Sequence, residues 1–373
     1  MRRSLWIPFV ALLITGCVLT TTPEPILPTP TPPPIPTDFP QAEQLVPGPQ
    51  ETSLAEEEKV DVPELVQLTQ PGCCVQPFWS ADGSMILFID RPQPTAPAGI
   101  YGVPLTGGEP QLASERVGLP SPDGRYRAYL SESGETVVEP VDSSTQWVIP
   151  NGGLRVFFSP TSQRLAWAAI PQSGNFDERP AVISVSDIDG SDPTEIITVY
   201  GGGIGGWLDD DHLLLVGRDK GGSQDVALFS LQVSDGTRTD LITNQRIRSV
   251  QIAPGGEWVS YTISLNTEDS AEDGLWVIRA DGGERYKLEA SGAAHWRDAT
   301  HLLLIPFESG SESHRLWEFS VESGQAYPLT DPAVTPFKVS SGDWSPSPDG
   351  KHVVFLADDQ ALWLLTLPLS HAQ

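Results

Sequence analysis

Basic residues are scarce in this chain. Its 373 residues include 22 Lys and Arg against 49 Asp and Glu, which gives a formal net charge of −27 at pH 7. An acidic excess of this size repels phosphate backbones, so nucleic-acid binding is disfavoured. An anionic membrane surface repels the chain in the same way, which disfavours peripheral electrostatic attachment. If the chain sits on a membrane, a covalent group must hold it there.

A long hydrophobic run is also missing at the N-terminus. The apolar run at residues 5–14 is interrupted by Pro8 and falls short of the roughly 20 apolar residues that a spanning helix needs. Arg2 and Arg3 precede it. A positive start followed by a short apolar run is typical of a secretory signal peptide, not of a membrane-spanning helix.

This run ends in the letters LITGC, residues 13–17. Small residues directly before a cysteine resemble the lipobox of bacterial lipoproteins. The resemblance implies a signal peptide over residues 1–16 and fatty acids, palmitate among them, on Cys17. Two or three acyl chains give stable anchoring, whereas one gives marginal binding. The chain is thus predicted to be exported and anchored to the cell membrane or the outer membrane. An ordinary secretory signal with a chance cysteine is the alternative.

Residues 17–60 lack the apolar content of a folded core. Thr20 to Pro49 consists mainly of Pro and Thr, and Glu56 to Glu58 add an acidic patch. Proline removes backbone donors and favours extended polyproline II. We therefore predict a disordered, lipid-anchored tether that lifts a folded domain off the membrane. A docking site for a proline-binding partner is the alternative.

Cysteine is rare, because only Cys73 and Cys74 accompany Cys17. An exported protein favours oxidised cysteine. Adjacent cysteines pair only through a strained ring, so a vicinal disulfide and two free thiols both remain open. The pair falls in a predicted connection between an outer strand and the next inner strand, which a disulfide would stiffen.

The remaining chain is rich in repeats. A turn of the type Trp-Ser-Ala-Asp-Gly is followed by a strand of apolar and aromatic residues, and a second hairpin signal comes later in each unit. Seven copies begin at Trp79, Pro120, Phe158, Trp207, Ile252, Trp296 and Pro346. This period matches the roughly 40–45 residues of a propeller blade. The sequence thus predicts an all-β, seven-bladed β-propeller over residues 64–369.

The two ends of the repeat region predict how the ring closes. The seventh unit stops after a third strand, at residues 362–365, while residues 65–69 form an outer-type strand with no blade of its own. We expect the N-terminal strand to complete the last blade. This pairing covers an edge that would otherwise stay open.

The repeats resemble a known family. The turn with its aromatic strand, followed by Leu-Trp and an Asp-Gly or Gly-Gly turn, is similar to the TolB-like (WD40-like, PD40) β-propeller repeat. That resemblance implies the fold and does not specify a function, because propellers host binding, scaffolding and catalysis alike.

Recognisable catalytic and metal motifs are absent from the sequence. His212 and His301 share one repeat position, which takes any polar residue, so we predict a solvated structural role for them in preference to metal binding. The segment 187–192 starts like a calcium loop but has Val199 where the twelfth-position Glu belongs. Residues 209–211 replace a Pro-Asp-Gly turn. No Gly-x-Ser-x-Gly motif exists. We therefore predict no enzyme activity, no cofactor and no bound metal.

Two further positions depart from the repeat pattern. Arg127 stands where the other units have an apolar residue. A charge there needs a partner or a position in the central channel. A local ion pair or a one-residue slip in the alignment of the repeats is the preferred interpretation, and a carboxylate-binding role is the alternative. Residues 201–206, five of them glycines, are interpreted as a flexible loop before the fourth unit.

These observations favour a membrane-anchored envelope lipoprotein whose propeller is a protein-interaction or scaffold module. The expected partners are one or more envelope proteins, besides the membrane itself through the lipid on Cys17. The alternative is a propeller that binds or processes a small ligand, a sugar or a peptide, at its central channel.

Overall fold

The computed structural model describes residues 63–171, 173–244, 246–264, 270–308 and 310–368. All of its strands belong to one compact unit, Lys59–Gln373. The predicted signal peptide, Cys17 and the whole predicted linker, residues 17–60, lie outside the described residues. Within the described ranges no helix is long and apolar enough to cross a membrane.

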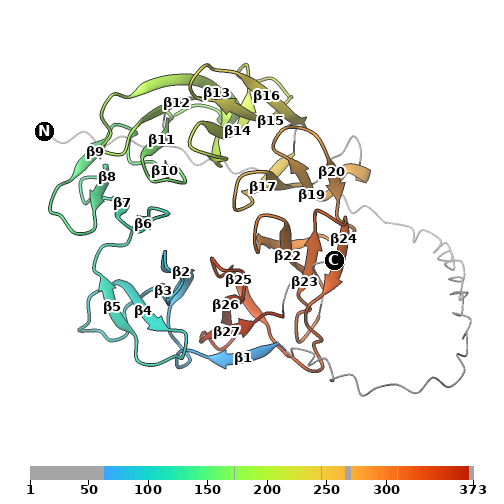
Figure 1. Cartoon of the computed structure of the whole chain (residues 1–373). Helices are drawn as coiled ribbons and strands as arrows, with labels where there is room; N and C mark the ends of the chain where they lie inside the picture. The colour runs from blue at the N-terminus through green and yellow to red at the C-terminus, as the bar shows by residue number, and fades with distance from the viewer. Residues whose placement is uncertain (1–62, 172, 245, 265–269, 309, 369–373) are drawn as a thin grey trace, which may run out of the picture. The chain divides into compact units, whose positions relative to one another are not determined.

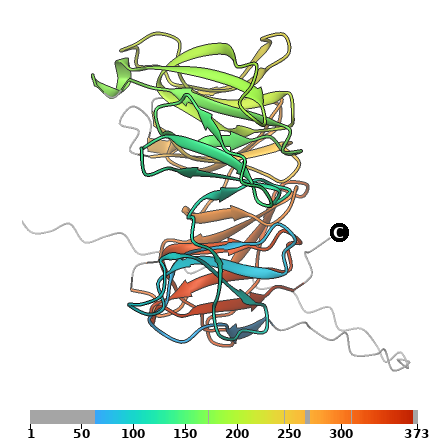
Figure 2. The same ribbon diagram turned by 90° about the vertical axis from the view of Figure 1, so that its left-hand side faces the viewer.

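The fold is an all-β propeller, with antiparallel sheets arranged around a centre (Figure 1). Five sheets have four strands each. Blade β2–β5 comprises β2 (Val75–Trp79), β3 (Met85–Asp90), β4 (Gly99–Pro104) and β5 (Gln111–Ser114). Blade β6–β9 comprises β6 (Leu119–Pro120), β7 (Tyr126–Leu130), β8 (Thr136–Pro140) and β9 (Trp147–Ile149). Figure 2 looks onto the side of the ring where blade β6–β9 lies.

Three further blades follow later in the chain. Blade β17–β20 comprises β17 (Ile247–Ile252), β18 (Trp258–Ile263), β19 (Gly274–Arg279) and β20 (Arg285–Lys287). Blade β21–β24 comprises β21 (Gly292–Trp296), β22 (His301–Pro306), β23 (Trp317–Ser320) and β24 (Gln325–Pro328). The closing blade comprises β25 (Val339–Pro346), β26 (His352–Ala357), β27 (Leu362–Thr366) and β1 (Glu64–Gln67). Two short 3-10 helices lie in connections, at Phe176–Glu178 and Ser270–Glu272.

The prediction of seven separate blades is wrong, because the sixth sheet has seven strands. It comprises β10 (Val156–Phe158), β11 (Arg164–Ala169), β12 (Pro180–Asp187), β13 (Thr194–Trp207), β14 (His212–Arg218), β15 (Ala227–Gln232) and β16 (Arg238–Thr243). Strand β13 pairs with β12 through its first half and with β14 through its second half. The third and fourth repeat units therefore share one continuous sheet.

Glycine explains the continuous strand. Residues 201–206, predicted to be a loop, lie within β13, where the pairing with β14 shifts register twice. A Cβ at Gly202 would come within 1.9 Å of the carbonyl oxygen of Val216. Because only glycine fits this approach, a segment that suggested flexibility is instead a strand held against its neighbour.

The predicted closure is confirmed. Strand β1 pairs antiparallel with β27, with Glu64 opposite Thr366 and Gln67 opposite Trp363. The backbone N–H of Leu362 also donates to the Thr69 hydroxyl at 2.9 Å. The first strand of the chain thus completes the last blade.

Buried apolar side chains form six clusters, and each joins two neighbouring repeat units. One joins the closing blade to blade β2–β5, one joins blade β6–β9 to sheet β10–β16, and one lies inside that sheet. The other three lie between the second half of sheet β10–β16 and blade β17–β20, between blades β17–β20 and β21–β24, and between blade β21–β24 and the closing blade. Within the described part of the chain, no such cluster joins blade β2–β5 to blade β6–β9. We call this interface the seam.

Candidate functional site

A proline at a repeat position explains why the seam is poorly filled. Pro120, the first residue of the second repeat unit, lies opposite Arg127 on the neighbouring strand. The first residues of the first and fourth units are tryptophans, and Trp79 lies opposite Ile86 and Trp207 opposite Leu213 in the same way. The two tryptophans are buried in clusters between units. Proline has a small side chain and no N–H, so it supplies neither the volume nor the donor of an indole.

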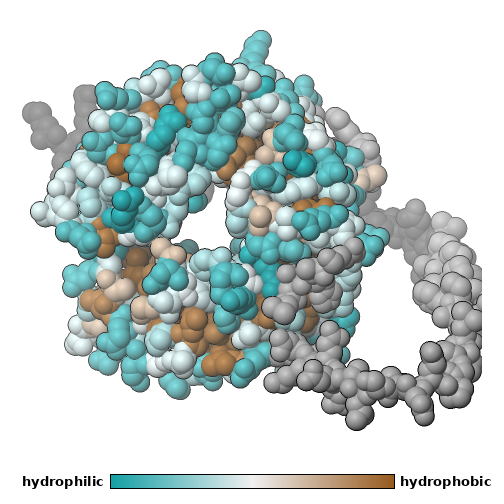
Figure 3. All heavy atoms as spheres, in the orientation of Figure 1, coloured by the Kyte–Doolittle hydropathy of each residue, from teal (hydrophilic) through white to brown (hydrophobic). Residues whose placement is uncertain are grey.

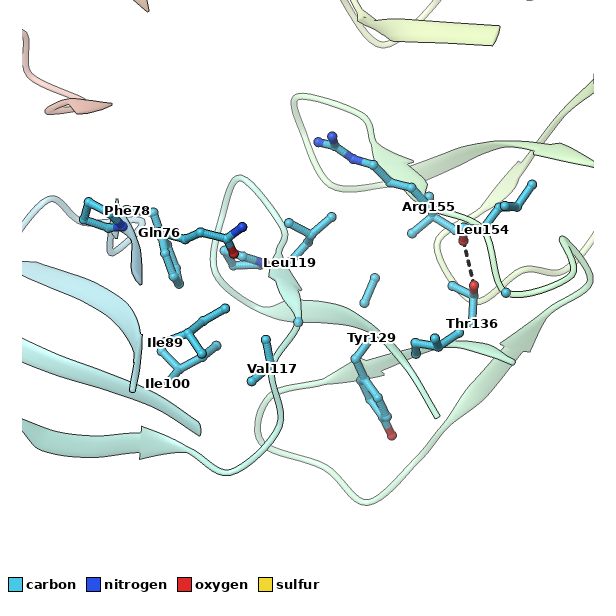
Figure 4. Close-up of a pocket in the computed structure, with 17 residues that line it drawn as sticks. Gln76, Phe78, Ile89, Ile100, Val117, Leu119, Tyr129, Thr136, Leu154 and Arg155 are labelled. Carbon is cyan, nitrogen blue, oxygen red and sulfur yellow. Dashed lines mark hydrogen bonds between the residues drawn. The ribbon is translucent and has the colours of Figure 1, made fainter. Parts of the chain in front are cut away.

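The seam contains a pocket of about 650 Å³. Its walls come from Phe78 of β2, from Ile89 and Ile100 at the ends of β3 and β4, and from Tyr129 of β7. Figure 4 shows the side chain of Val117, in the connection between the blades, lying between the two isoleucines and Tyr129. The volume falls within the range of about 300–1,000 Å³ that small-molecule sites occupy.

Nearly all of the lining is apolar. Among the lining residues the one charged side chain is that of Arg155, which extends away from the other labelled residues (Figure 4). The Thr136 hydroxyl is occupied, since it donates to the carbonyl of Leu154 at 2.6 Å. Pro120 also lines two adjoining pockets of about 680 and 500 Å³. The seam is thus hollow on more than one side of Pro120.

Exposed apolar residues gather near the seam. Val117, Leu119 and Leu130 line the pocket and are 47%, 44% and 61% exposed. Of the ten large hydrophobic residues exposed in the described part of the chain, seven lie on the two seam blades or their connections. Brown surface borders the gap between these blades in the space-filling view (Figure 3). An exposed apolar surface around a pocket is typical of an interaction site.

Polar groups bridge the seam beside the pocket. Glu139 of β8 is fully buried, and Arg127 donates to it from Nε at 2.6 Å. Arg127 also donates from Nη1 to the hydroxyl of Ser114, on the opposite blade, at 2.9 Å. Arg116, in the connection, forms a second ion pair with Glu139. The structure thus gives Arg127 the local ion pair that the sequence favoured.

Two neutral groups complete the surroundings of this carboxylate. Tyr129 donates its hydroxyl at 3.0 Å and Gln146 its amide at 3.1 Å. Burial by itself would raise the pKa of Glu139, but the hydrogen bonds from Arg116 and Arg127 outweigh it and hold the pKa below its usual value. The carboxylate of Glu139 thus fixes Arg127 and Arg116, and Arg127 in turn makes the hydrogen bond across the seam to Ser114.

Cys73 and Cys74 lie between β1 and β2, as predicted, and the structure joins them as a disulfide. Cys74 has a positive φ of 69° and is buried. The N–H of Cys73 donates to the carbonyl of Gln360 at 3.0 Å, so the pair is tied to the closing blade. Their redox state in the cell stays a prediction.

The three aspartates at residues 209–211 are engaged by hydrogen bonds, one within their own turn and two to other turns. Asp209 accepts from His212, and Asp210 accepts from the hydroxyl of Thr161 at 2.8 Å. Asp211 accepts from Ser234 at 2.7 Å. Within the described ranges, no three His, Cys, Asp or Glu side chains gather as a metal site would require.

His301 differs from the solvated residue that the sequence predicted. It is buried, and its Nδ1 lies 2.9 Å from Asp298. Hydrogen bonding to Asp298 raises the pKa of His301, even though burial opposes the charged form. His212 at the same repeat position pairs with Asp209 but stays more exposed. Both histidines therefore begin a strand and bind an aspartate of the turn before it.

Comparison with known proteins supports the fold alone. No family model and no curated protein matches the chain. An oligogalacturonate lyase in complex with manganese superposes with a TM-score of 0.55 at 16% identity, over 83% of this chain and 97% of that one. The β-propeller domain of the trilobed protease from Pyrococcus furiosus gives 0.52 at 13% identity, over 80% and 98%. The chain shares the propeller fold with them.

TolB from Acinetobacter baumannii is a weaker match. It gives a TM-score of 0.39 at 15% identity, over 62% of this chain and 59% of TolB. The TolB-like character of the repeats therefore rests on their sequence motifs. None of these likenesses carries a catalytic role to this chain, and the expectation that it is not an enzyme stays a prediction.

Proposed function

We propose that this chain is a lipid-anchored envelope protein whose propeller binds a partner protein at the seam. The observation that carries the proposal is the apolar pocket between blades β2–β5 and β6–β9, whose rim residues Val117, Leu119 and Leu130 are exposed. A solvent-exposed apolar rim around a pocket is stabilised when a partner covers it. Lipid on Cys17 and the Pro/Thr-rich tether would keep the propeller outside the cytoplasm, near envelope partners.

The propeller supports binding in a second way. Six of its interfaces are filled by buried apolar clusters, so most of the ring is a rigid platform. The seam, by contrast, has an ion-pair cluster on one side and an unfilled pocket on the other. A partner that inserts apolar side chains there would bury surface that the chain itself leaves exposed.

The proposal is tested by chemical cross-linking in intact envelopes and by identifying what co-purifies. Leu119→Asp places a charge on the pocket rim, so we expect it to lose the partner. Phe307→Asp is the matched control, because Phe307 is 81% exposed on another blade. Cys17→Ala removes the predicted anchor and should lower the yield of the partner.

Two outcomes would contradict the proposal. Capture of the same partner by Leu119→Asp would remove the seam as its docking site. No partner above background in the wild-type sample would argue against an interaction module.

A further inference from the structure

We propose that the seam pocket receives an indole, a tryptophan side chain of the partner, in the place that a tryptophan of this chain fills at other interfaces. This inference rests on the proposed function, because it names the part of the partner that the pocket binds. It follows from what this ring does elsewhere at the same repeat position.

Tryptophans of this chain join neighbouring units by a common contact. Trp79 donates from Nε1 to the carbonyl of Ser345 on the closing blade at 3.1 Å. Trp207 donates from Nε1 to the carbonyl of Phe157 at 3.0 Å. Trp296 is buried at the same repeat position, and its Nε1 has no partner among the described residues. An indole at this position thus fills the interface, and in two of three cases it donates to the preceding inner strand.

The seam has the acceptor side of this contact. Ser345 directly precedes Pro346 and Phe157 directly precedes Phe158, and Pro346 and Phe158 are the first residues of their repeat units. In blade β2–β5 the equivalent residue is Phe78, which directly precedes Trp79. Phe78 lines the seam pocket. Residue 120, which would supply the indole, is proline. At the seam, the chain therefore has no side chain at this position that could donate a hydrogen bond to the carbonyl of Phe78.

The wall that would receive the ring is also present. Trp79 shares its cluster with Leu356 and Leu362, which are opposite each other in β26 and β27. Ile89 and Ile100 are opposite each other at the corresponding position of β3 and β4, and both line the seam pocket. An apolar pair thus stands where an indole packs at the neighbouring interface.

The closing blade also has a proline as the first residue of its repeat unit, and there a tryptophan from another position fills the interface. Pro346 pairs with Val353 in the register of Pro120 with Arg127. Two residues earlier, Trp344 is buried in the cluster between blade β21–β24 and the closing blade. The residue two before Pro120 is Gly118, which has no side chain to offer. At the seam, an aromatic ring at this position would have to come from another molecule.

The test measures binding of two small probes to the full-length lipidated protein in lipid nanodiscs, by saturation-transfer NMR. The probes are N-acetyl-L-tryptophanamide and N-acetyl-L-leucinamide, which is apolar but lacks the ring and its N–H. We expect the tryptophan probe to give the stronger signal. Pro120→Trp should lose that signal, because the new indole occupies the pocket, and Pro346→Trp should keep it.

Thermal unfolding provides the readout that shows the variants are folded. Pro120→Trp fills a hollow interface, so its melting temperature should rise. Pro346→Trp adds a ring to a filled cluster, so its melting temperature should fall. If Pro120→Trp does not fold, Leu119→Asp replaces it, since a charge on the rim should also remove the tryptophan signal.

The outcomes separate this inference from the proposed function. Equal signals from the two probes, or a tryptophan signal that survives Pro120→Trp, would overturn the indole inference. If Pro120→Trp still captures the envelope partner while Leu119→Asp does not, the seam remains the docking site and the indole inference is wrong. If both substitutions abolish capture and Pro346→Trp does not, both proposals are supported.

Discussion

Glu139 is fully buried at the seam, and four side chains hold it there. A buried carboxylate is costly unless it is paired and hydrogen-bonded, so its stability depends on these donors. Arg127 is the donor that the sequence singled out, because every equivalent residue is apolar. The sequence could show that Arg127 needs a partner but not that the partner is Glu139, which becomes its neighbour only through the pairing of β7 with β8.

Glu139→Gln should destabilise the propeller at neutral pH. The substitution leaves Arg127 and Arg116 without their carboxylate, and we expect a loss of about 3 kcal/mol in the free energy of unfolding. This is the lower end of the range for buried pairs, because both arginines are partly exposed. Urea unfolding of wild type and Glu139→Gln measures this loss, and a value below about 1 kcal/mol would contradict a stabilising role for the buried ion pairs.

The same difference should depend on pH in one direction. Because the pKa of Glu139 is lowered in the folded state, its stabilising effect is fully present above the unfolded pKa and is lost as pH falls through the folded pKa. The gap between wild type and Glu139→Gln should therefore narrow in acid. A gap that stays constant down to the acid limit of folding would argue against the ionised carboxylate.

Strands were the part of the fold most accessible to sequence reasoning. Repeated turns and apolar, aromatic strands predicted the blades, and an unpaired N-terminal strand together with a last unit of three strands predicted the pairing of β1 with β27. The double sheet was not predictable in this way. Residues 201–206 have the composition of a loop, and only the closeness of Gly202 to Val216 shows that the glycines serve a strand.

Gly202→Ala should destabilise the seven-stranded sheet. The added Cβ meets backbone, which cannot rotate away, so we expect a loss of about 3 kcal/mol in the free energy of unfolding. Gly203→Ala is the matched control, because a Cβ there meets nothing within 4 Å. Chemical unfolding measures the free energy of unfolding of both variants. Equal stability of the two variants would mean that β13 does not run continuously from β12 to β14.

At the scale of the whole molecule, the seam was not predicted. The repeat positions did contain its signal, since Pro120 stands where four other units have an aromatic residue. Recognising a hollow there also needed the facing sides of β3 and β7, which sequence alone does not place. The anchor on Cys17 and the tether are the converse case: the sequence predicts them, and they stay predictions because they lie outside the described residues.

The central claim is that the partner contacts the seam. A photo-cross-linking amino acid, placed at residue 119 in one variant and at residue 307 in another, tests it most directly in intact envelopes. Both positions are exposed and apolar in the wild type, and they lie on different blades. If the partner docks at the seam, position 119 gives one dominant adduct and position 307 gives none of that species. An adduct from position 307 alone, or none from either, would contradict it.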